Sequence, residues 1–301
     1  MMELNGLHIL LTYTCNYECD HCFVWGSPRQ TGVFTLARLD NALQQASDAG
    51  TIREIYFEGG EAFLYYPLLL EGVRRATSHG FSTGIVSNGY WATSAEDARI
   101  WLEPLVEAGL KSLEISSDPF HAEDPECLAA ERVNAAAGEL GLSTSTITID
   151  HTGEARDAAQ WKPGLPLSGG GVMFRGRAAE ALVEGLPRQP WDAFPDCPYE
   201  ELENPGRLHL DPFGNLHLCQ GLVIGNLFHH SLRDILEEYD PRLDPLVGPL
   251  ISGGPSLLIE MFLKDGQDEY VDACHACYAV RLALRGAFPA ILGPDQMYGV
   301  N

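Results

Sequence analysis

Three closely spaced cysteines near the start of the chain constrain its fold and chemistry more than any other feature. Cys15, Cys19 and Cys22 form a C-x3-C-x2-C array directly after the apolar run 7–12, with no fourth cysteine nearby. Thiolates are soft ligands that suit iron–sulfur clusters or zinc, but structural zinc closes a tetrahedron with four ligands. Three thiolates instead favour a four-iron cluster that leaves one iron open. Three unrelated thiols, or part of a zinc site, are the alternatives.

The array resembles the cluster loop of the radical S-adenosylmethionine (SAM) enzymes, which has this spacing and follows the first strand of a barrel. In that family an aromatic residue or His precedes the third cysteine, and His21 stands there. The resemblance implies that the open iron binds SAM. It also implies that a reductant such as flavodoxin or ferredoxin supplies electrons to the cluster.

Gly59, Gly60 and Glu61 form a second motif, one predicted strand later. Glycines allow close backbone approach, and carbonyl oxygens together with a carboxylate suit an ammonium group. The motif resembles the Gly-Gly-Glu-Pro loop that takes the amino group of SAM in radical SAM enzymes, although Ala62 stands in place of the usual Pro. A Gly-Gly-Glu motif is weak when taken alone, and a surface turn that contains Glu61 is the alternative.

Strands and helices are predicted to alternate through the first part of the chain. Six short apolar or β-branched runs are predicted strands, at 7–12, 52–57, 81–87, 111–116, 143–150 and 170–175. Helical spacing predicts helices at 35–49, 68–79, 94–108 and 125–140. This alternation indicates a parallel sheet, which right-handed crossovers curl toward a barrel. We therefore expect an α/β fold with a partial (β/α)6 TIM-like barrel.

Polar residues follow several of these strands, where parallel α/β sheets and barrels bind their ligands. By resemblance, the residues expected to contact SAM are Phe23, Gly59, Gly60, Glu61, Ser87, Asn88, Ser117, Met173, Arg175 and Arg177. Arg175 or Arg177 would pair with the SAM carboxylate through a guanidinium fork, and Phe23 and Met173 would flank the adenine. The alternatives are an Asn-Gly turn at Asn88 and helix-capping or salt-bridge roles for the two arginines. Phe23 and Met173 would then be core residues.

Three residues near the fourth strand are candidate catalytic groups. Asp118 directly follows that strand, and His121 is a candidate base or substrate contact, although a lone His in a loop also suits a structural role. Cys127 is the cysteine left outside the predicted metal sites. A buried free cysteine usually behaves as a small hydrophobic residue. Resemblance to radical epimerases gives the other interpretation, in which Cys127 donates a hydrogen atom to a substrate radical.

The second half of the chain has a different pattern. Apolar and polar residues alternate on both sides of a Pro-Phe-Gly-Asn turn between 207 and 219, which predicts a β-hairpin, and a helix is expected at 231–239. Hairpin, turn and acidic helix resemble the SPASM and twitch extensions of radical SAM enzymes, which hold auxiliary clusters. The resemblance implies one closed auxiliary cluster, as in the twitch form, with the ligands Cys197, Cys219, Cys274 and Cys277.

Zinc is the alternative for this second site, because a C-x2-C pair taken alone also suits a zinc ribbon. The two predicted sites divide the chain into a radical SAM partial barrel at 1–185 and a twitch/SPASM-like auxiliary cluster domain at 186–301. Both sites use clustered cysteines, which fits metal binding better than a secreted disulfide scaffold at this chain length.

Composition excludes several other classes of protein. The net charge of −23 disfavours nucleic acid and anionic membrane surfaces as partners. No uncharged apolar stretch reaches the ~18 residues that suggest a membrane helix. The N-terminal residues show no basic-then-apolar signal segment. We therefore expect a cytoplasmic protein.

The resemblance to radical SAM enzymes implies an enzyme that cleaves SAM to a 5'-deoxyadenosyl radical, which then abstracts a hydrogen from a substrate, and that contains two 4Fe–4S clusters. Two-electron oxidation is favoured, with the auxiliary cluster as electron acceptor. A small molecule or short peptide is the expected substrate, because no separate peptide-recognition segment precedes the first strand. The alternatives are a peptide maturase that forms a crosslink or an epimer, and a non-catalytic iron–sulfur or zinc protein.

Overall fold

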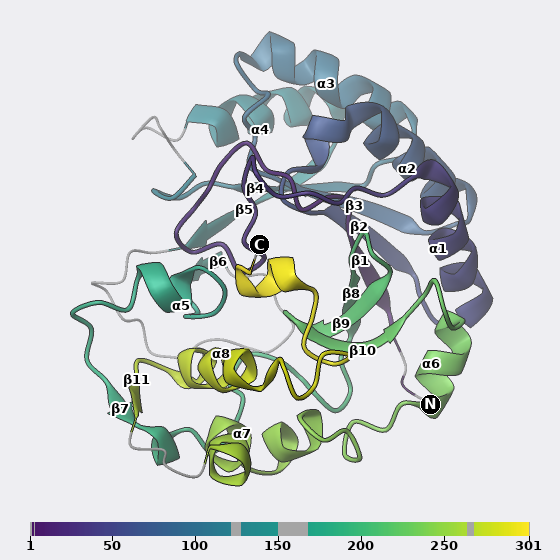
Figure 1. The fold of residues 1–301 in the computed structure, drawn as a ribbon. Coiled ribbons are helices and arrows are strands. Elements are labelled where there is room, and N and C mark those ends of the chain that lie inside the picture. Colours follow the sequence, from purple (N-terminus) through teal and green to yellow (C-terminus); the bar gives the residue numbers. More distant parts are fainter. Residues whose placement is uncertain (1, 3, 122–127, 150–167, 264–267, 301) are drawn as a thin grey trace.

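The computed structural model describes residues 2, 4–121, 128–149, 168–263 and 268–300. A nine-stranded sheet runs through the molecule in the order β10-β9-β8-β1-β2-β3-β4-β5-β6 (Figure 1). Its first six strands are β1 (Gly6–Leu10), β2 (Glu54–Glu58), β3 (Ser82–Ser87), β4 (Ser112–Ser116), β5 (Ser143–Ile149) and β6 (Ser168–Gly170). They pair in parallel and in chain order, which confirms the predicted partial barrel.

Helices cover the outer face of this curved sheet (Figure 1). They are α1 (Leu36–Ala49), α2 (Tyr66–Ser78), α3 (Ala95–Glu107) and α4 (Leu128–Leu140), with the short helix η1 (Ala62–Tyr65) before α2. Thr35 caps α1 by accepting a hydrogen bond from the backbone N–H of Arg38, and Ser94 caps α3 in the same way with Asp97. Both caps agree with the helix starts predicted from the sequence.

Alternate residues of each strand face opposite sides of the sheet, which separates the core from the barrel interior. On β1, Leu7 and Ile9 are completely buried in the main hydrophobic core, as are Ile55 and Phe57 on β2. His8, which lies between Leu7 and Ile9 on β1, faces the other side of the sheet and lines the interior cavity. The core packing of the apolar residues thereby fixes which polar side chains point into the barrel.

The sixth strand differs from the prediction. The strand 170–175 was expected, but β6 ends at Gly170 and the chain leaves the sheet there. Val172 and Phe174 are buried in a small second core with Ala178 of α5 (Ala178–Ala181). Their alternation therefore reflects packing against a helix rather than strand pairing, so that prediction was wrong in its extent.

The predicted hairpin is present as β8 (Arg207–Leu210) and β9 (Asn215–Cys219), which pair antiparallel. A further strand that was not predicted, β10 (Leu222–Asn226), continues from β9. The hairpin also joins the barrel, because β8 pairs in parallel with β1. One sheet thus crosses the predicted boundary at 185/186, and the division into two domains stays a prediction.

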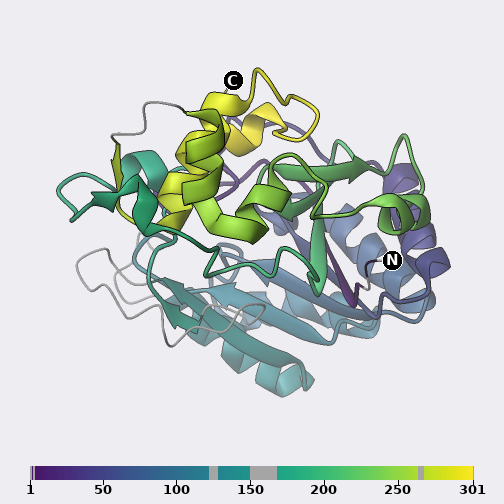
Figure 2. The ribbon, with the colours of Figure 1, turned by 90° about the horizontal axis from the view of Figure 1, so that it is seen from below.

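Most of the remaining elements lie across the barrel interior from α1–α4 (Figures 1 and 2). They are the strands β7 (Gln189–Pro190) and β11 (Glu269–Tyr270), the helices α7 (Val247–Phe262) and α8 (Ala273–Leu284), and the short helices η3 (Trp191–Ala193) and η4 (Asp295–Tyr298). Helix α6 (Leu232–Glu238) packs instead against α1. Ser231 caps α6, as the predicted helix requires. Within the described ranges, none of the helices is both long and apolar enough to cross a membrane.

Candidate functional site

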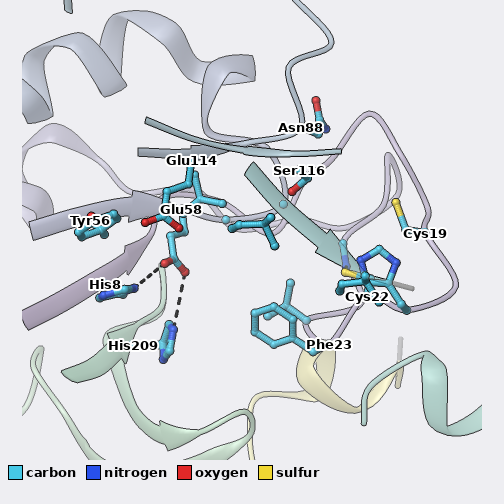
Figure 3. A pocket seen from close by; sticks show the side chains of 18 of the residues that line it. His8, Cys19, Cys22, Phe23, Tyr56, Glu58, Asn88, Glu114, Ser116 and His209 are labelled. Carbon is cyan, nitrogen blue, oxygen red and sulfur yellow. Dashed lines mark hydrogen bonds and ion pairs between the residues drawn. The ribbon is translucent and has the colours of Figure 1, made fainter. Parts of the chain in front are cut away.

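The cluster loop brings the thiols of Cys15, Cys19 and Cys22 into the lining of an interior cavity of about 540 Å³. Figure 3 shows Cys19 and Cys22 at one end of it. All three are free thiols. Burial, together with the charges of Glu61 and Cys22, raises the pKa of Cys15 to about 12. Three such neighbouring thiols would not ionise together at neutral pH without a cation to stabilise them. Their arrangement therefore fits a metal cluster, whose binding would release their protons.

Arg177 holds the cluster loop in place. Its Nη1 donates to the carbonyl oxygen of Cys19 at 2.6 Å, and its Nη2 donates to that of Gly26 at 2.9 Å. The guanidinium also lies 5.2 Å from the ring centre of Trp25. This arginine was expected to pair with the SAM carboxylate, but it does not line the cavity in the described structure. These contacts give Arg177 a structural role in the loop, and its contact with SAM stays a prediction.

The loop after β2 packs directly against the cluster loop. The backbone N–H of Gly60 donates to the carbonyl oxygen of Thr12 at 2.7 Å, and that of Glu61 donates to the carbonyl oxygen of Thr14 at 2.9 Å. A Cβ atom on Gly60 would lie only 2.3 Å from the oxygen of Thr14, so glycine is required there. Gly59 and Gly60 both line the cavity beside the three thiols.

The carboxylate of Glu61 is buried and already has several protein partners. Its Oε1 accepts hydrogen bonds from the N–H of Phe63 at 3.0 Å and the hydroxyl of Ser87 at 2.9 Å. Its Oε2 accepts from the N–H of Asn88 at 2.8 Å. Burial raises its pKa, which these hydrogen bonds oppose. Glu61 does not line the cavity, so the geometry makes it a link between the ends of β2 and β3, and contact with the SAM amino group stays a prediction.

Residues at the ends of β3 and β4 line the cavity next to the thiols. Asn88 donates from Nδ2 to Asn16 Oδ1 at 2.9 Å and to the sulfur of Cys15 at 3.7 Å. Ser117 was also expected here, but it is Ser116 that lines the cavity. The difference follows from strand alternation, because Glu114, Ser116 and Asp118 share one face of β4 and its extension.

Asp118 and His121 form a pair in the wall of the cavity. His121 Nδ1 lies 2.8 Å from Asp118 Oδ1, and the ring of His21 is 4.9 Å from that of His121. Burial lowers the pKa of His21 to about 4, with a further contribution from His121. Burial alone would raise the pKa of Asp118, but the hydrogen bond and charge of His121 outweigh it and lower that pKa. Within the described residues, the buried Oδ2 of Asp118 makes no hydrogen bond.

That unpartnered oxygen bears on whether SAM fits here. A buried acceptor that lacks a partner is costly, and a ribose hydroxyl or an ammonium group would satisfy it. Backbone groups of Gly59 and Gly60 and the side chain of Asn88 lie around the same end of the cavity. The donor set of three thiols and these polar groups therefore fits a cluster with a bound SAM molecule.

A second group of thiols lies in the extension. Cys197, Cys219, Cys274 and Cys277 line one small, mostly apolar cavity. The last two are three residues apart on α8, which places them on one face of that helix. Burial, together with the neighbouring Cys219 and Cys277, raises the pKa of Cys197 to about 12. Four thiols gathered in this way fit a closed metal cluster or a zinc ion, and their role as ligands stays a prediction.

Arg175 connects the two thiol groups. Its Nη1 donates to Glu200 Oε1 at 2.9 Å and to the sulfur of Cys219 at 3.3 Å, and its guanidinium lies 5.2 Å from the ring centre of Phe23. Arg175 and Glu200 line both the main cavity and the small one. This arginine was expected to pair with the SAM carboxylate. The structure places it in the wall between the main cavity and Cys219.

Most of the predicted site residues meet in the main cavity. Those that line it are Cys15, Cys19, Cys22, Phe23, Gly59, Gly60, Ser87, Asn88, Asp118, His121, Met173 and Arg175. Glu61, Ser117 and Arg177 stand outside its lining. Cys127, a candidate hydrogen donor, lies outside the described residues.

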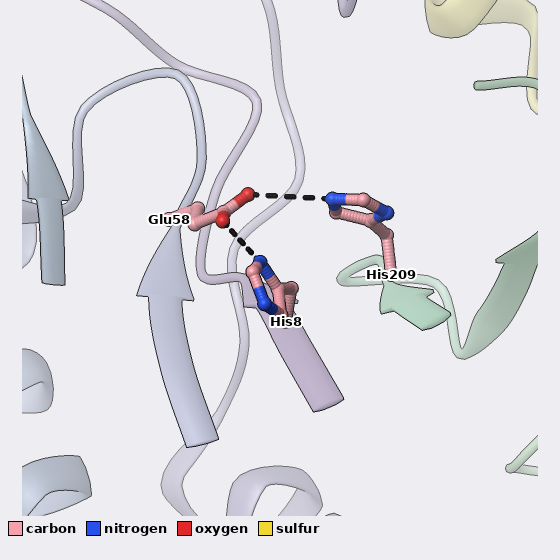
Figure 4. Close-up of side chains that lie close together, drawn as sticks. All are labelled: His8, Glu58 and His209. Carbon is pink, nitrogen blue, oxygen red and sulfur yellow. Dashed lines mark hydrogen bonds and ion pairs between the residues drawn. The ribbon is translucent and has the colours of Figure 1, made fainter. Parts of the chain in front are cut away.

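Sequence reasoning missed the polar residues deeper in the barrel. His8, Glu58 and His209 converge there (Figure 4), with His8 Nδ1 at 2.5 Å from Glu58 Oε1 and His209 Nε2 at 3.7 Å from Glu58 Oε2. Burial by itself raises the pKa of Glu58, but the charge and hydrogen bond of His8, with His209 and Arg207, lower it to about 2. Burial lowers the pKa of His209 to about 3. The sequence did contain one sign of this group, because His8 is a polar residue between apolar neighbours in the first predicted strand.

The fold and the site define a class of protein: a partial α/β barrel with a three-cysteine loop at the mouth of its cavity and a second thiol group in a C-terminal extension. Residues 9–139 match the radical SAM superfamily. This segment, a little under half of the chain, includes the cluster loop and the loop after β2, and enzymes of this superfamily use SAM and a 4Fe–4S cluster.

Two curated proteins are similar to parts of the chain. The putative peptide biosynthesis protein YydG of Bacillus subtilis (strain 168) is 30% identical over 114 residues, which is 38% of this chain and 36% of that protein. The GTP 3',8-cyclase of Chlorobaculum tepidum is 30% identical over 149 residues, which is 48% of this chain and 42% of that protein. The chain thus spans less than half of the length of either relative.

A solved structure is similar over a larger part of the chain. The crystal structure of BtrN in complex with AdoMet and 2-DOIA has a TM-score of 0.53 at 17% identity, and the match covers 79% of this chain and 84% of that one. At this identity the likeness concerns the fold. Its coverage extends past the barrel into the extension, so both predicted parts of the fold belong to the shared architecture.

Proposed function

We propose that the chain is a radical SAM oxidoreductase that removes two electrons from a small molecule or short peptide. In this proposal Cys15, Cys19 and Cys22 hold a 4Fe–4S cluster whose open iron binds SAM. The other four cysteines hold an auxiliary 4Fe–4S cluster. The observation that supports it most is the position of Arg175, which contacts the main cavity and the sulfur of Cys219 at once.

Several side chains would prepare the site for the cofactor. Arg177 holds both ends of the cluster loop, and Glu61 ties the loop after β2 to the end of β3. Asp118 Oδ2 offers an unpartnered acceptor within the described residues. Bound at this cluster, SAM would supply a 5'-deoxyadenosyl radical that abstracts a hydrogen from a substrate in the cavity.

The auxiliary site would serve as an electron acceptor rather than as a substrate site. Four thiolates would leave none of the irons in its cluster open to a substrate. A two-electron oxidation requires the substrate radical to lose one electron, and the cavity wall at Arg175 is the part of the described lining that touches Cys219. The guanidinium places positive charge next to a thiolate ligand, which favours the reduced state of the cluster.

A peptide maturase is the second candidate function. It is favoured by the similarity of residues in this chain to a protein named as a putative peptide biosynthesis protein. If such a reaction were an epimerisation, a hydrogen atom would have to return to the substrate, and the thiol of Cys127 would donate it. A cytoplasmic location and reduction by flavodoxin or ferredoxin belong to both versions of the proposal.

The iron content of the protein tests whether it holds the two proposed clusters. Protein reconstituted without oxygen should contain about eight irons per chain, the content of two four-iron clusters. Cys19→Ala should lose one cluster, and Cys277→Ala should lose the other. An iron content that stops near four, with zinc at the second site, would instead show that the extension is a structural zinc site.

One comparison separates oxidation from epimerisation. With a substrate in hand, oxidation predicts that Cys127→Ala turns over nearly as fast as the parent protein, with no solvent deuterium in the product carbon. Epimerisation predicts that the same variant is inactive, and that the parent incorporates solvent deuterium. The second pattern would overturn the proposed oxidation.

A further inference from the structure

Three side chains in the deep part of the cavity form a cluster that the proposed reaction does not use. They are His8 on β1, Glu58 on β2 and His209 on β8, and all three line the cavity. In Figure 3 they lie at the end away from Cys19 and Cys22. We propose that they form a third metal site, which binds one divalent first-row transition ion such as zinc.

The sheet itself brings these residues together. The strands β8, β1 and β2 are neighbours, and His8 and His209 are register partners across the β1–β8 pair. Tyr56 is the partner of His8 on β2, and Glu58, two residues further along, shares its face of the sheet. Side chains on paired strands are positioned more firmly than side chains on loops. The three neighbouring strands therefore provide the rigid support that a metal site needs.

The distances suit coordination. The possible ligand atoms of the three residues all lie within 4.8 Å of one another, and the contacts of His8 and His209 with Glu58 are 2.5 Å and 3.7 Å. Metal–ligand bonds of about 2.0–2.2 Å in a tetrahedral site place neighbouring ligand atoms roughly 3.3–3.6 Å apart. The observed separations lie on either side of that range. Small side-chain rotations would therefore bring all three ligands around one ion.

The donor set and its surroundings identify the kind of ion. Two imidazoles and one carboxylate form the ligand set of many catalytic zinc sites, and of non-haem ferrous sites, which keep positions open for a further ligand. The His8 ring stacks on Tyr56 at 4.9 Å between ring centres and 15° between planes, which fixes its orientation.

The local charge also favours a cation. Glu54 and Glu114 line the same cavity as Glu58, and so does Arg207. Figure 3 shows Glu114 beside Glu58. Without a metal, the direct contact of Glu58 with His8 would remain, and the cluster would act as a proton relay. The two states differ in one measurable quantity, the presence of the ion.

A metal here would extend the proposed function to the recognition of the substrate. Because all three ligands line the cavity, the open coordination position would face the space where a substrate sits. An oxygen donor of the substrate, such as a hydroxyl or carboxylate group, would complete the coordination. Metal binding itself requires neither SAM cleavage nor oxidation, so it can hold even if the proposed reaction fails.

The experiment counts zinc in protein that already contains both iron–sulfur clusters, so that the cysteines are occupied. The parent protein, incubated with Zn²⁺ and then desalted, should retain about one zinc per chain. The variants His8→Gln and His209→Gln should lose it. Glu114→Gln is the matched control, because it removes a carboxylate from the same cavity without removing a ligand, and it should retain the zinc.

X-ray absorption at the zinc edge identifies the ligands of any ion that is bound. Nitrogen and oxygen ligands at about 2.0–2.1 Å are expected, whereas zinc at vacant cysteines would show sulfur at about 2.3 Å. The inference is overturned if the cluster-loaded parent retains no zinc. Zinc that survives in both histidine variants, or that shows a sulfur shell, overturns it as well. The first of these results would leave the three residues as a metal-free proton relay.

Discussion

Arg175 Nη1 lies 3.3 Å from the sulfur of Cys219, and the same guanidinium contacts the ring of Phe23, which follows directly on the cluster loop. Three residues far apart in the sequence thus form a continuous path from one thiol group to the other. The path passes through the wall of the main cavity. An electron that leaves a substrate in that cavity would meet the auxiliary cluster at this arginine.

The first prediction concerns the reduction potential of the auxiliary cluster. Arg175→Met removes a positive charge and a hydrogen bond from a ligand sulfur, both of which favour the reduced state. The potential should fall by about 60 mV, which for one electron corresponds to about 1.4 kcal/mol. A redox titration followed by electron paramagnetic resonance measures this. Arg175→Lys, which retains the charge, should shift the potential less, and an unchanged potential in Arg175→Met would refute the contact.

The second prediction concerns Glu61. Its carboxylate accepts hydrogen bonds from Phe63, Ser87 and Asn88, and an amide in its place turns one acceptor into a donor. Glu61→Gln should lower the free energy of unfolding by about 1–3 kcal/mol and weaken SAM binding as a consequence. Thermal unfolding and SAM titration are measured on the same preparation. Weaker SAM binding at unchanged stability would instead indicate direct contact with the SAM ammonium.

The third prediction concerns Asp211, which joins the hairpin to the barrel. Its Oδ1 accepts from the N–H of Asn215 at 2.9 Å, and its Oδ2 accepts from the hydroxyl of Tyr13 at 3.0 Å and lies 3.1 Å from Nε2 of His217. Asp211→Asn should lower the free energy of unfolding by about 2–4 kcal/mol, because buried groups lose a charged partner. Tyr13→Phe, which removes only one of these contacts, should cost less, by about 0.5–1.5 kcal/mol.

The pH dependence of this effect follows from the pKa of Asp211. Burial alone would raise that pKa, but the hydrogen bond and charge of His217 outweigh it and lower the pKa below the ordinary value. A carboxyl with a lowered folded-state pKa stabilises the protein above its unfolded-state pKa, near 3.9, and loses this effect only as the pH falls through the folded value. The cost of Asp211→Asn should therefore be the same at pH 6 and pH 8. A cost that disappears at pH 6 would contradict the shift.

Local sequence was sufficient for much of the fold and for the grouping of the cysteines that are the predicted metal ligands. Thr35 and Ser94 marked helix starts, because a capping side chain acts on N–H groups only a few residues away. The spacing of Cys15, Cys19 and Cys22 placed three thiols in one loop without knowledge of the rest of the chain. The strand predicted at 170–175 failed, because a short apolar alternation also arises where a segment packs against a helix.

Contacts between distant segments could not be predicted in this way. His209 meets His8 only because β8 adds to the sheet beside β1, a pairing between segments about 200 residues apart in the chain. The partners of Arg175 and Arg177 are likewise set by tertiary packing, and the sequence only indicated that two arginines followed a strand. Ser116 rather than Ser117 faces the cavity because the start of β4 fixes the alternation, and a one-residue shift reverses it.

The central claim is that the chain holds one cluster that binds SAM and a second, closed cluster. Electron paramagnetic resonance of the reduced protein, with and without SAM, tests it most directly. We predict signals from two clusters, of which SAM changes one, together with 5'-deoxyadenosine formation from SAM. Cys219→Ala should remove the signal that SAM leaves unchanged and retain 5'-deoxyadenosine formation. A spectrum that SAM leaves unaltered, with no 5'-deoxyadenosine from the reduced protein, would contradict the account.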